Sequence, residues 1–469
     1  METQKKRGNF SGSLGFVLAA AGSAVGLGNI WRFPYLAAKD GGGLFLLVYV
    51  VLALTFGFAL LTSEIAIGRK TGQSPLTAYG ELSKKWKWIG VFACIIPAMI
   101  LPYYSAIGGW ILKYMGDYFM GGIAAGEADA HFGGFITAQW SPIIWFLLFL
   151  AATIFVVYKG VDRGIERLSR ILMPALLVLI IGISVFSLTL SHTDDAGVTR
   201  TGIDGLLVYL IPNFEGLTFN KFFTVLMDAM GQLFYSISVA MGIMITYGSY
   251  VKKETNIAKS VNHIEIFDTA VAFLAGLMII PAVYTFMGHD GLSASGPTLM
   301  FKSLPKVFDA MGGIGTFVGI AFFLMVAFAA LTSSVSLLEA IVSSLMDQFK
   351  IERKKSVVLV SAVTAVLGII VCLGYNVFYF ELTLPNGSVA QILDIMDYIS
   401  NYILMPVVSI ATCLLIGWVV GPKTIIDEVT LNGETFKRKG LYTVMVKYVT
   451  PVLLLLLLLQ ALGLILKAN

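Results

Sequence analysis

The sequence predicts an all-α polytopic membrane protein, and two observations carry this prediction. Hydrophobic residues make up 57% of the 469 residues and charged residues only 13%, whereas a soluble domain carries about 25% charged residues. Apolar runs also recur along the whole chain, each close to the roughly 20 residues that a helix needs to cross a bilayer. We therefore expect a single integral membrane domain over residues 1–469.

Eleven hydrophobic segments are predicted to be transmembrane helices. In chain order they lie near 11–37, 43–69, 89–116, 141–158, 168–190, 222–250, 262–287, 315–346, 355–373, 392–420 and 442–466. Residues 1–10 are basic and polar, and no small-residue cleavage site follows the first apolar run. These ten residues therefore predict a retained cytoplasmic tail rather than a signal peptide.

The basic residues predict the orientation. Of the 32 lysines and arginines, 24 lie in the tail and in every second loop after it. Because cytoplasmic loops are the ones enriched in lysine and arginine, the N-terminus is expected in the cytoplasm. An odd number of spans then places the C-terminus outside the cell.

Two predicted spans contain residues that interrupt a helix. The first carries AGSAVGLGNIWRFP at 21–34, and the sixth carries GQLFYSISVAMG at 231–242. The second of them comes five spans after the first, so they occupy matching positions if 11–190 and 222–420 are two inverted five-helix halves, with 442–466 as an eleventh helix. Such a pair is typical of a binding site at the middle of the membrane, where unpaired carbonyls bind cations. The alternative is that the glycines only allow tight helix packing.

Several motifs resemble those of the neurotransmitter:sodium symporter family, and the resemblance covers nearly the whole chain. The motifs are AGSAVGLGNIWRFPY (21–35), DGGG (40–43), SEIAIGR (63–69), PYYSAIGGW (102–110), ITYGSYV (245–251) and FAALTSSVSLLEA (328–340). The chain is similar to the prokaryotic amino-acid branch, because it lacks a cysteine pair in its long outer loop and ends after the eleventh span. The resemblance implies a multi-pass protein of a prokaryotic cell membrane.

The resemblance also implies two sodium sites. The first would use Ala24, Asn29, Ser236 and Asp268 together with the substrate carboxylate. The second would use carbonyls of Gly22, Val25 and Ala329 and the hydroxyls of Thr332 and Ser333. The alternative for the two hydroxyls is a hydrogen bond to their own helix. Asp268 replaces the asparagine of many relatives, so its negative charge predicts transport that needs no chloride.

The expected substrate is a small zwitterionic amino acid. Gly26 stands where monoamine transporters of the family have aspartate, and this leaves room for a carboxylate. The resemblance implies a binding pocket lined by Ala24, Gly26, Gly28, Ile100, Tyr104, Tyr235, Ser236, Ser238, Val239, Met241, Ser333 and Leu337. None of these side chains carries a full charge, so the sequence favours a neutral, hydrophobic or aromatic side chain. Another small amine or an osmolyte is the alternative.

The resemblance implies a gate at each end of the pathway. Arg32, inside the first span, needs a partner in the membrane, and Asp397 is the expected one. At the cytoplasmic end Arg7 is expected to pair with Asp347. The sequence shows no acid–base pair or nucleophile motif within the spans and no basic nucleic-acid patch, so we expect a transporter in the lipid bilayer rather than an enzyme.

Overall fold

The computed structural model describes residues 8–194, 196–294 and 296–465, and most of these residues are helical. Nine of the helices, or ten if one bent pair counts as a single span, are long and apolar enough to cross a membrane. The bent pair belongs to the first predicted span, and its two parts meet at an angle of 53°. Two short antiparallel hairpins complete the described secondary structure.

The helices of the first half follow the predicted segments closely. In chain order the elements are α1 (Ser13–Ala24), the π-helical turn η1 (Gly28–Arg32), α2 (Phe33–Lys39), α3 (Gly43–Leu52), η2 (Ala53–Gly57), α4 (Phe58–Thr71), α5 (Pro75–Leu82), η3 (Lys84–Trp86), α6 (Trp88–Phe119), η4 (Ala125–Glu127), α7 (Ala128–Thr137), α8 (Ser141–Tyr158), η5 (Val161–Glu166) and α9 (Arg167–Leu188).

The second half contains the shorter elements of the loops as well as the spans. It consists of β1 (Ser191–Thr193), β2 (Thr199–Thr201), α10 (Gly202–Leu210), α11 (Phe219–Ser236), α12 (Ile243–Gly248), α13 (Ile257–Gly291), α14 (Gly296–Thr298), η6 (Leu299–Ser303), α15 (Leu304–Ala310), α16 (Gly313–Phe349), α17 (Arg353–Leu373), β3 (Leu382–Thr383), β4 (Val389–Ala390), α18 (Ile392–Asp397), η7 (Tyr398–Leu404), α19 (Met405–Leu414), η8 (Leu415–Val419), α20 (Lys423–Val429), α21 (Lys439–Val444), η9 (Met445–Val449) and α22 (Thr450–Ala461).

The sixth predicted segment, 222–250, is interrupted, as the first one is. It lies in α11 and the six-residue α12, with a non-helical stretch at 237–242 between them. The break is therefore shorter than the predicted 231–242, because the chain stays helical through Ser236. The count of eleven spans and the five-plus-five repeat stay predictions.

The interior of the bundle is built from α1, α4, α6, α12 and α16. Helix α16 packs against α6, α1 and α9, and α12 packs against α4 and α16. In α4 every residue from Phe58 to Arg69 is buried. The peripheral helices α8, α9 and α17 instead expose large aliphatic residues such as Ile144, Val178 and Val363, as expected of helices that face lipid.

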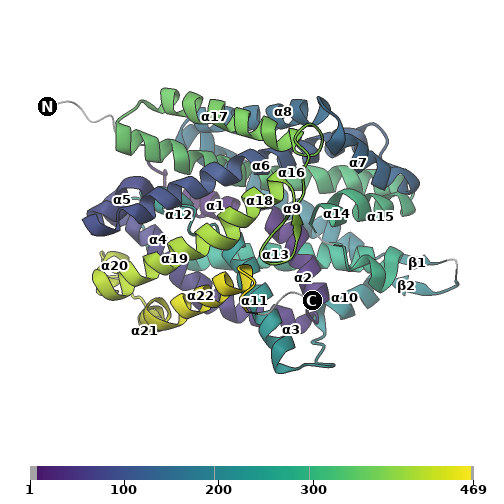
Figure 1. Ribbon diagram of the computed structural model, residues 1–469. Coiled ribbons are helices and arrows are strands. Elements are labelled where there is room, and N and C mark those ends of the chain that lie inside the picture. Colours follow the sequence, from purple (N-terminus) through teal and green to yellow (C-terminus); the bar gives the residue numbers. More distant parts are fainter. Residues whose placement is uncertain (1–7, 195, 295, 466–469) are drawn as a thin grey trace.

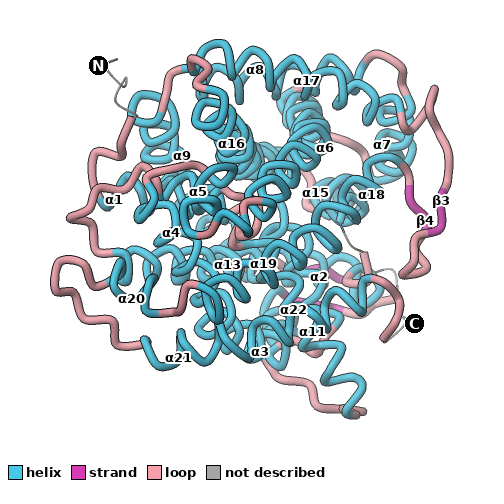
Figure 2. Tube along the Cα trace, turned by 60° about the vertical axis from the view of Figure 1, so that its left-hand side comes forward, coloured by secondary structure: helices cyan, strands magenta, loops and turns pink. Residues whose placement is uncertain are grey.

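The two ends of the bundle carry different loops. Figure 1 shows α5 and α20 at its left-hand end and the β1–β2 hairpin with α15 at its right-hand end. Figure 2 shows the same division, with α20 on the left and the β3–β4 hairpin on the right. The end with α5 and α20 holds the basic loops and is the predicted cytoplasmic end, and the other is the predicted extracellular end.

Candidate functional site

The first break opens the backbone at the end of α1. Val25 has an extended conformation (φ −72°, ψ 102°), and helical structure resumes at residue 27. A side chain at Gly26 would meet Ser333 Oγ at 3.0 Å and Tyr104 Oη at 3.1 Å from its Cβ. A Cβ at Gly28 would lie 2.8 Å from the Tyr235 ring. The glycines therefore let the broken span approach its neighbours as closely as it does.

The second break is held in an unusual conformation. Ser238 and Ala240 have φ of 53° and 65°, a region that residues with a side chain seldom occupy. Two contacts hold the stretch in place: the Ala240 amide donates to Glu64 Oε1 at 2.6 Å, and Ser238 Oγ donates to the Ser23 carbonyl at 2.9 Å. This role of Glu64 was not predicted, although an acidic residue inside a predicted span indicates a functional position.

Polar groups from three spans meet at Asp268, which is 1% exposed. Its Oδ1 accepts hydrogen bonds from Asn29 Nδ2 at 2.9 Å and Ser236 Oγ at 2.7 Å, and Asn29 Oδ1 accepts one from the Gly26 amide at 3.1 Å. Among the described residues Asp268 Oδ2 has no hydrogen-bond partner, although the Tyr49 side chain faces it. A buried carboxylate oxygen without a donor, surrounded by neutral oxygens, suits a monovalent hard cation. These residues therefore fit the first expected sodium site.

A second group of oxygens lies between the end of α1 and the middle of α16. Ser333 Oγ is 3.5 Å from the Gly22 carbonyl oxygen, 3.1 Å from that of Ser23 and 3.3 Å from that of Val25. Thr332 Oγ1 instead bonds within its own helix, to the carbonyls of Phe328 at 3.1 Å and Ala329 at 3.0 Å. Carbonyls at the interrupted end of a helix have no amide donor within that helix. The cluster therefore fits a cation bound by uncharged oxygens. The Ser23 carbonyl was not among the predicted ligands.

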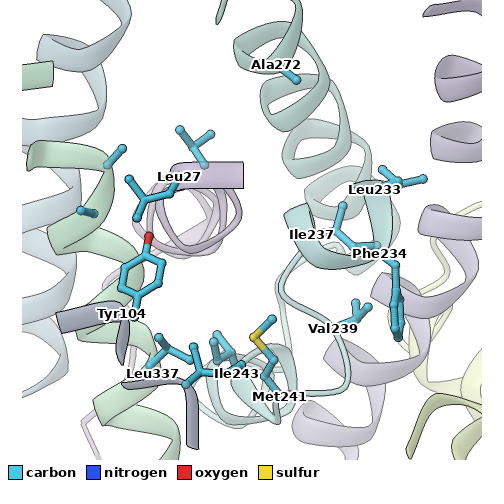
Figure 3. Close-up of a cluster of buried hydrophobic side chains, with 14 of the residues drawn as sticks. Leu27, Tyr104, Leu233, Phe234, Ile237, Val239, Met241, Ile243, Ala272 and Leu337 are labelled. Carbon is cyan, nitrogen blue, oxygen red and sulfur yellow. The ribbon is translucent and has the colours of Figure 1, made fainter. Parts of the chain in front are cut away.

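A cavity of about 30 Å³ lies between the two breaks. Figure 3 shows Leu27, Tyr104, Leu337, Ile243 and Met241 around it. The full lining is Ser23, Ala24, Gly26, Leu27, Gly28, Asn29, Ile100, Tyr104, Tyr235, Ser236, Ser238, Met241, Ile243, Ser333 and Leu337.

The cavity brings together all the residues expected to bind substrate except one. Val239 lies on the other side of the broken stretch, next to Phe234 (Figure 3). Leu27 and Ile243 line the cavity without having been predicted. No Asp, Glu, Lys, Arg or His is among these lining residues, so the cavity suits an uncharged side chain. That they bind a substrate stays a prediction.

A larger cavity, of about 160 Å³, lies on the predicted extracellular side of the first. Arg32, Asp228, Asn401, Tyr402 and Gln460 are among its lining residues, and Tyr235 lines both cavities. The Tyr235 side chain therefore separates the inner cavity from the outer one.

The predicted gate pair Arg32 and Asp397 is not joined by an ion pair in the described part of the chain. The Arg32 guanidinium lies 5.7 Å from the centre of the Tyr402 ring. Asp397 Oδ1 accepts hydrogen bonds from Tyr103 Oη at 3.0 Å and Asn401 Nδ2 at 2.6 Å. Arg32 lines the outer cavity, and both side chains use other partners in this structure.

The predicted cytoplasmic gate is only partly described, because Arg7 lies outside the described residues. Asp347 accepts the Ser74 amide at 2.7 Å. Nearby, the buried Glu339 accepts hydrogen bonds from Tyr250 Oη at 2.6 Å and from Arg353 at 3.0 and 2.5 Å. From the sequence, Arg353 is only one of the basic loop residues, because nothing local links it to Glu339.

The chain is similar to known sodium-dependent transporters. The model of the sodium:neurotransmitter symporter family matches residues 7–134 and 127–467. An uncharacterised sodium-dependent transporter of Bacillus subtilis, YhdH, is 33% identical over 99% of both chains, and one from Methanocaldococcus jannaschii is 31% identical over 92% of this chain and 85% of its own.

The solved structures include a similar transporter. The crystal structure of MhsT in complex with L-phenylalanine matches with a TM-score of 0.84 and 34% identity, over 97% of this chain and 100% of that one. The mammalian relatives include the rat sodium- and chloride-dependent GABA transporter 2, which is 25% identical over 90% of this chain and 75% of its own. The broken spans, the buried oxygen clusters and these matches lead to one conclusion: the chain is a sodium-dependent multi-pass membrane transporter that belongs to the sodium:neurotransmitter symporter family.

Proposed function

We propose that the protein imports a neutral amino acid with a hydrophobic or aromatic side chain together with sodium, by alternating access. One observation carries the proposal: an uncharged cavity lies between the two broken spans and has a cluster of buried oxygens on each side. The clusters would hold two sodium ions as co-substrates.

The substrate would be bound by its backbone and by its side chain separately. Its carboxylate would lie near the Gly28 amide, the Tyr104 hydroxyl and the sodium held at Asp268, because glycine at position 26 leaves space there. Its amine would be bound by carbonyls of the broken stretches. Its side chain would contact apolar lining residues such as Ile100 and Leu337. The bound phenylalanine of the MhsT structure supports this choice of substrate class.

Chloride independence is part of the proposal. The family includes chloride-dependent transporters, whereas here Asp268 supplies a fixed negative charge in the first cation cluster. A carboxylate at this position would neutralise bound sodium without a bound anion.

The proposed cycle uses the inverted repeat and the two gates. The N-terminus is cytoplasmic and the C-terminus extracellular in this proposal, so Arg32 and Asp397 close the outer end after the substrate has bound. The inner end then opens when the contacts of Arg7 with Asp347 and the hydrogen bonds of Tyr250 and Arg353 to Glu339 separate. Two ions entering down roughly 100 mV and a tenfold gradient release about 7 kcal/mol, which is enough to drive accumulation.

The test is a binding panel with purified protein: twenty amino acids, each with sodium and with potassium in its place. We expect sodium-dependent binding of neutral hydrophobic or aromatic amino acids and none of charged ones. A panel without any sodium-dependent ligand would end the amino-acid proposal.

A small amine or osmolyte is the second candidate, because the family also contains GABA transporters. Adding these compounds as competitors to the same panel distinguishes the two candidates.

A further inference from the structure

A buried pair of carboxyl groups lies at the predicted extracellular end, outside the two cation clusters. Asp40 directly follows α2 and begins the DGGG loop, and Asp228 lies on α11. Asp40 is 5% exposed, and its Oδ2 accepts no hydrogen bond from any described residue. The facing carboxylate of Asp228 is bound by Lys39 Nζ at 2.9 Å. The ammonium group of Lys39 is therefore used by one carboxylate of the pair, Asp228.

A proton is the ligand that completes this arrangement. Two adjacent carboxylates do not both ionise readily, and a proton between them gives the unpartnered oxygen a hydrogen bond. Burial, and then repulsion from Asp228, raise the pKa of Asp40 to about 7. A metal cation fits less well, because it would have to compete with Lys39 for Asp228.

The charges around Asp40 come from two helices and one loop. Lys39 on α2 and Lys221 on α11 both favour the ionised form of Asp40, whereas Asp228 opposes it. The loop between α10 and α11 contacts the DGGG loop through the Asn213 amide, which donates to the Gly41 carbonyl at 3.0 Å. The other ionisable residues on these neighbouring segments are Arg32, Tyr35, Glu215 and Tyr235.

Asp228 also connects the pair to the outer cavity, because Asp228 and Arg32 line the same 160 Å³ space. We propose that Asp40 and Asp228 form a proton-binding site at the extracellular end, and that the proton controls whether Arg32 is free to close the outer gate. When Asp40 is protonated, it donates to Asp228, which Lys39 already neutralises, and Arg32 is available to Asp397. When Asp40 is ionised, it competes for Lys39, and Asp228 attracts Arg32 away from Asp397.

This proposal predicts that extracellular acid strengthens substrate binding, and in this respect it rests on the proposed function. The assay measures the apparent Kd for L-phenylalanine, at saturating sodium, with purified protein between about pH 6 and pH 8. We expect binding to weaken roughly fivefold over this range in the wild type, the low end of typical coupling between sites. In Asp40→Asn the pH dependence is lost, because an amide donates to Asp228 at every pH.

Asp290→Asn is the matched control, because Asp290 is an exposed carboxyl at the same end of the bundle. It should keep the wild-type pH profile. An Asp40→Asn protein with the same pH profile as the wild type would overturn the gating role of the pair.

An infrared titration tests the proton site without any transport or binding measurement. The wild-type spectrum minus the Asp40→Asn spectrum should contain the carbonyl band of one protonated carboxylic acid, and this band should disappear between about pH 6 and pH 8. Absence of the band overturns the proton site whatever the protein transports. If the band is present and the amino-acid panel fails, the proton site stands and only the proposed substrate is wrong.

Discussion

A methyl group added at Gly26 tests whether the small cavity binds the substrate. Gly26 lies at the first break, and the Cβ of Gly26→Ala would be 3.0 Å from Ser333 Oγ and 3.1 Å from Tyr104 Oη. Both neighbours are hydroxyl groups on side chains, so they can move by a few tenths of an ångström and the protein should still fold. The substrate, in contrast, would have to share its space with the methyl group.

The expected loss of affinity follows from the size of the cavity. The cavity measures only about 30 Å³, where a single water molecule needs about 10–15 Å³. An added methyl group therefore fills most of the free space beside the expected carboxylate position. Overpacking of this kind costs about 1–3 kcal/mol, which corresponds to roughly 5-fold to 150-fold weaker binding.

Equilibrium binding of radiolabelled phenylalanine to purified protein, with a thermal unfolding scan of each variant, measures this effect. Gly182→Ala is the control, because Gly182 lies within α9 and a Cβ there meets no atom within 4 Å. Gly182→Ala should bind as the wild type does. If Gly26→Ala folds normally and also keeps wild-type affinity, the substrate does not bind in this cavity and the reasoning is wrong.

Three further substitutions test the two cation clusters and a buried ion pair. Replacing chloride by gluconate should leave wild-type uptake unchanged, and a collapse of this uptake would contradict chloride independence. Asp268→Asn should weaken sodium binding roughly 10-fold to 1,000-fold, because it removes a buried negative charge whose attraction for sodium is worth about 4 kcal/mol at 4 Å. Ser333→Ala removes the hydroxyl that lies 3.1 Å from a carbonyl of α1 and should weaken sodium binding roughly tenfold, while the exposed Ser388→Ala should not. Arg69→Lys should lower the melting temperature by several degrees. Arg69 Nε binds Glu428 at 2.8 Å in a buried ion pair, and disrupting such a pair costs about 3–5 kcal/mol. An unchanged melting temperature would show that lysine can replace the arginine in this pair.

The contacts of Arg353 at the predicted cytoplasmic end could not be predicted from the sequence. Arg353 was predicted only as a basic loop residue, yet it binds Glu339 through both oxygens and also donates to the Val157 carbonyl at 2.8 Å. Val157 lies 196 residues earlier in the chain. No local pattern carries information about a contact at such a separation, so only the folded structure shows it.

The sequence predicted the region of the break in the sixth span but not its bounds, because the bounds also depend on contacts between distant parts of the chain. The glycines and serines at 231–242 indicated that a helix would be interrupted there, but six of these residues remain in α11. Glu64 from α4 holds the Ala240 amide and so helps to decide where the helix stops. Intrinsic propensity indicated the region of the break, and a tertiary contact determined its residues.

The sequence by itself determined the class of the protein, its long apolar helices and the region of the two breaks, because hydrophobic length and glycine content act locally along the chain. The tertiary structure decided which oxygens meet at Asp268 and Ser333, and it decided that Arg32 and Asp397 take other partners here. It also brought Asp40 next to Asp228, on a helix that lies far away in the sequence. The physical reason is that buried polar groups must find partners, and in a bundle of long helices those partners come from other spans.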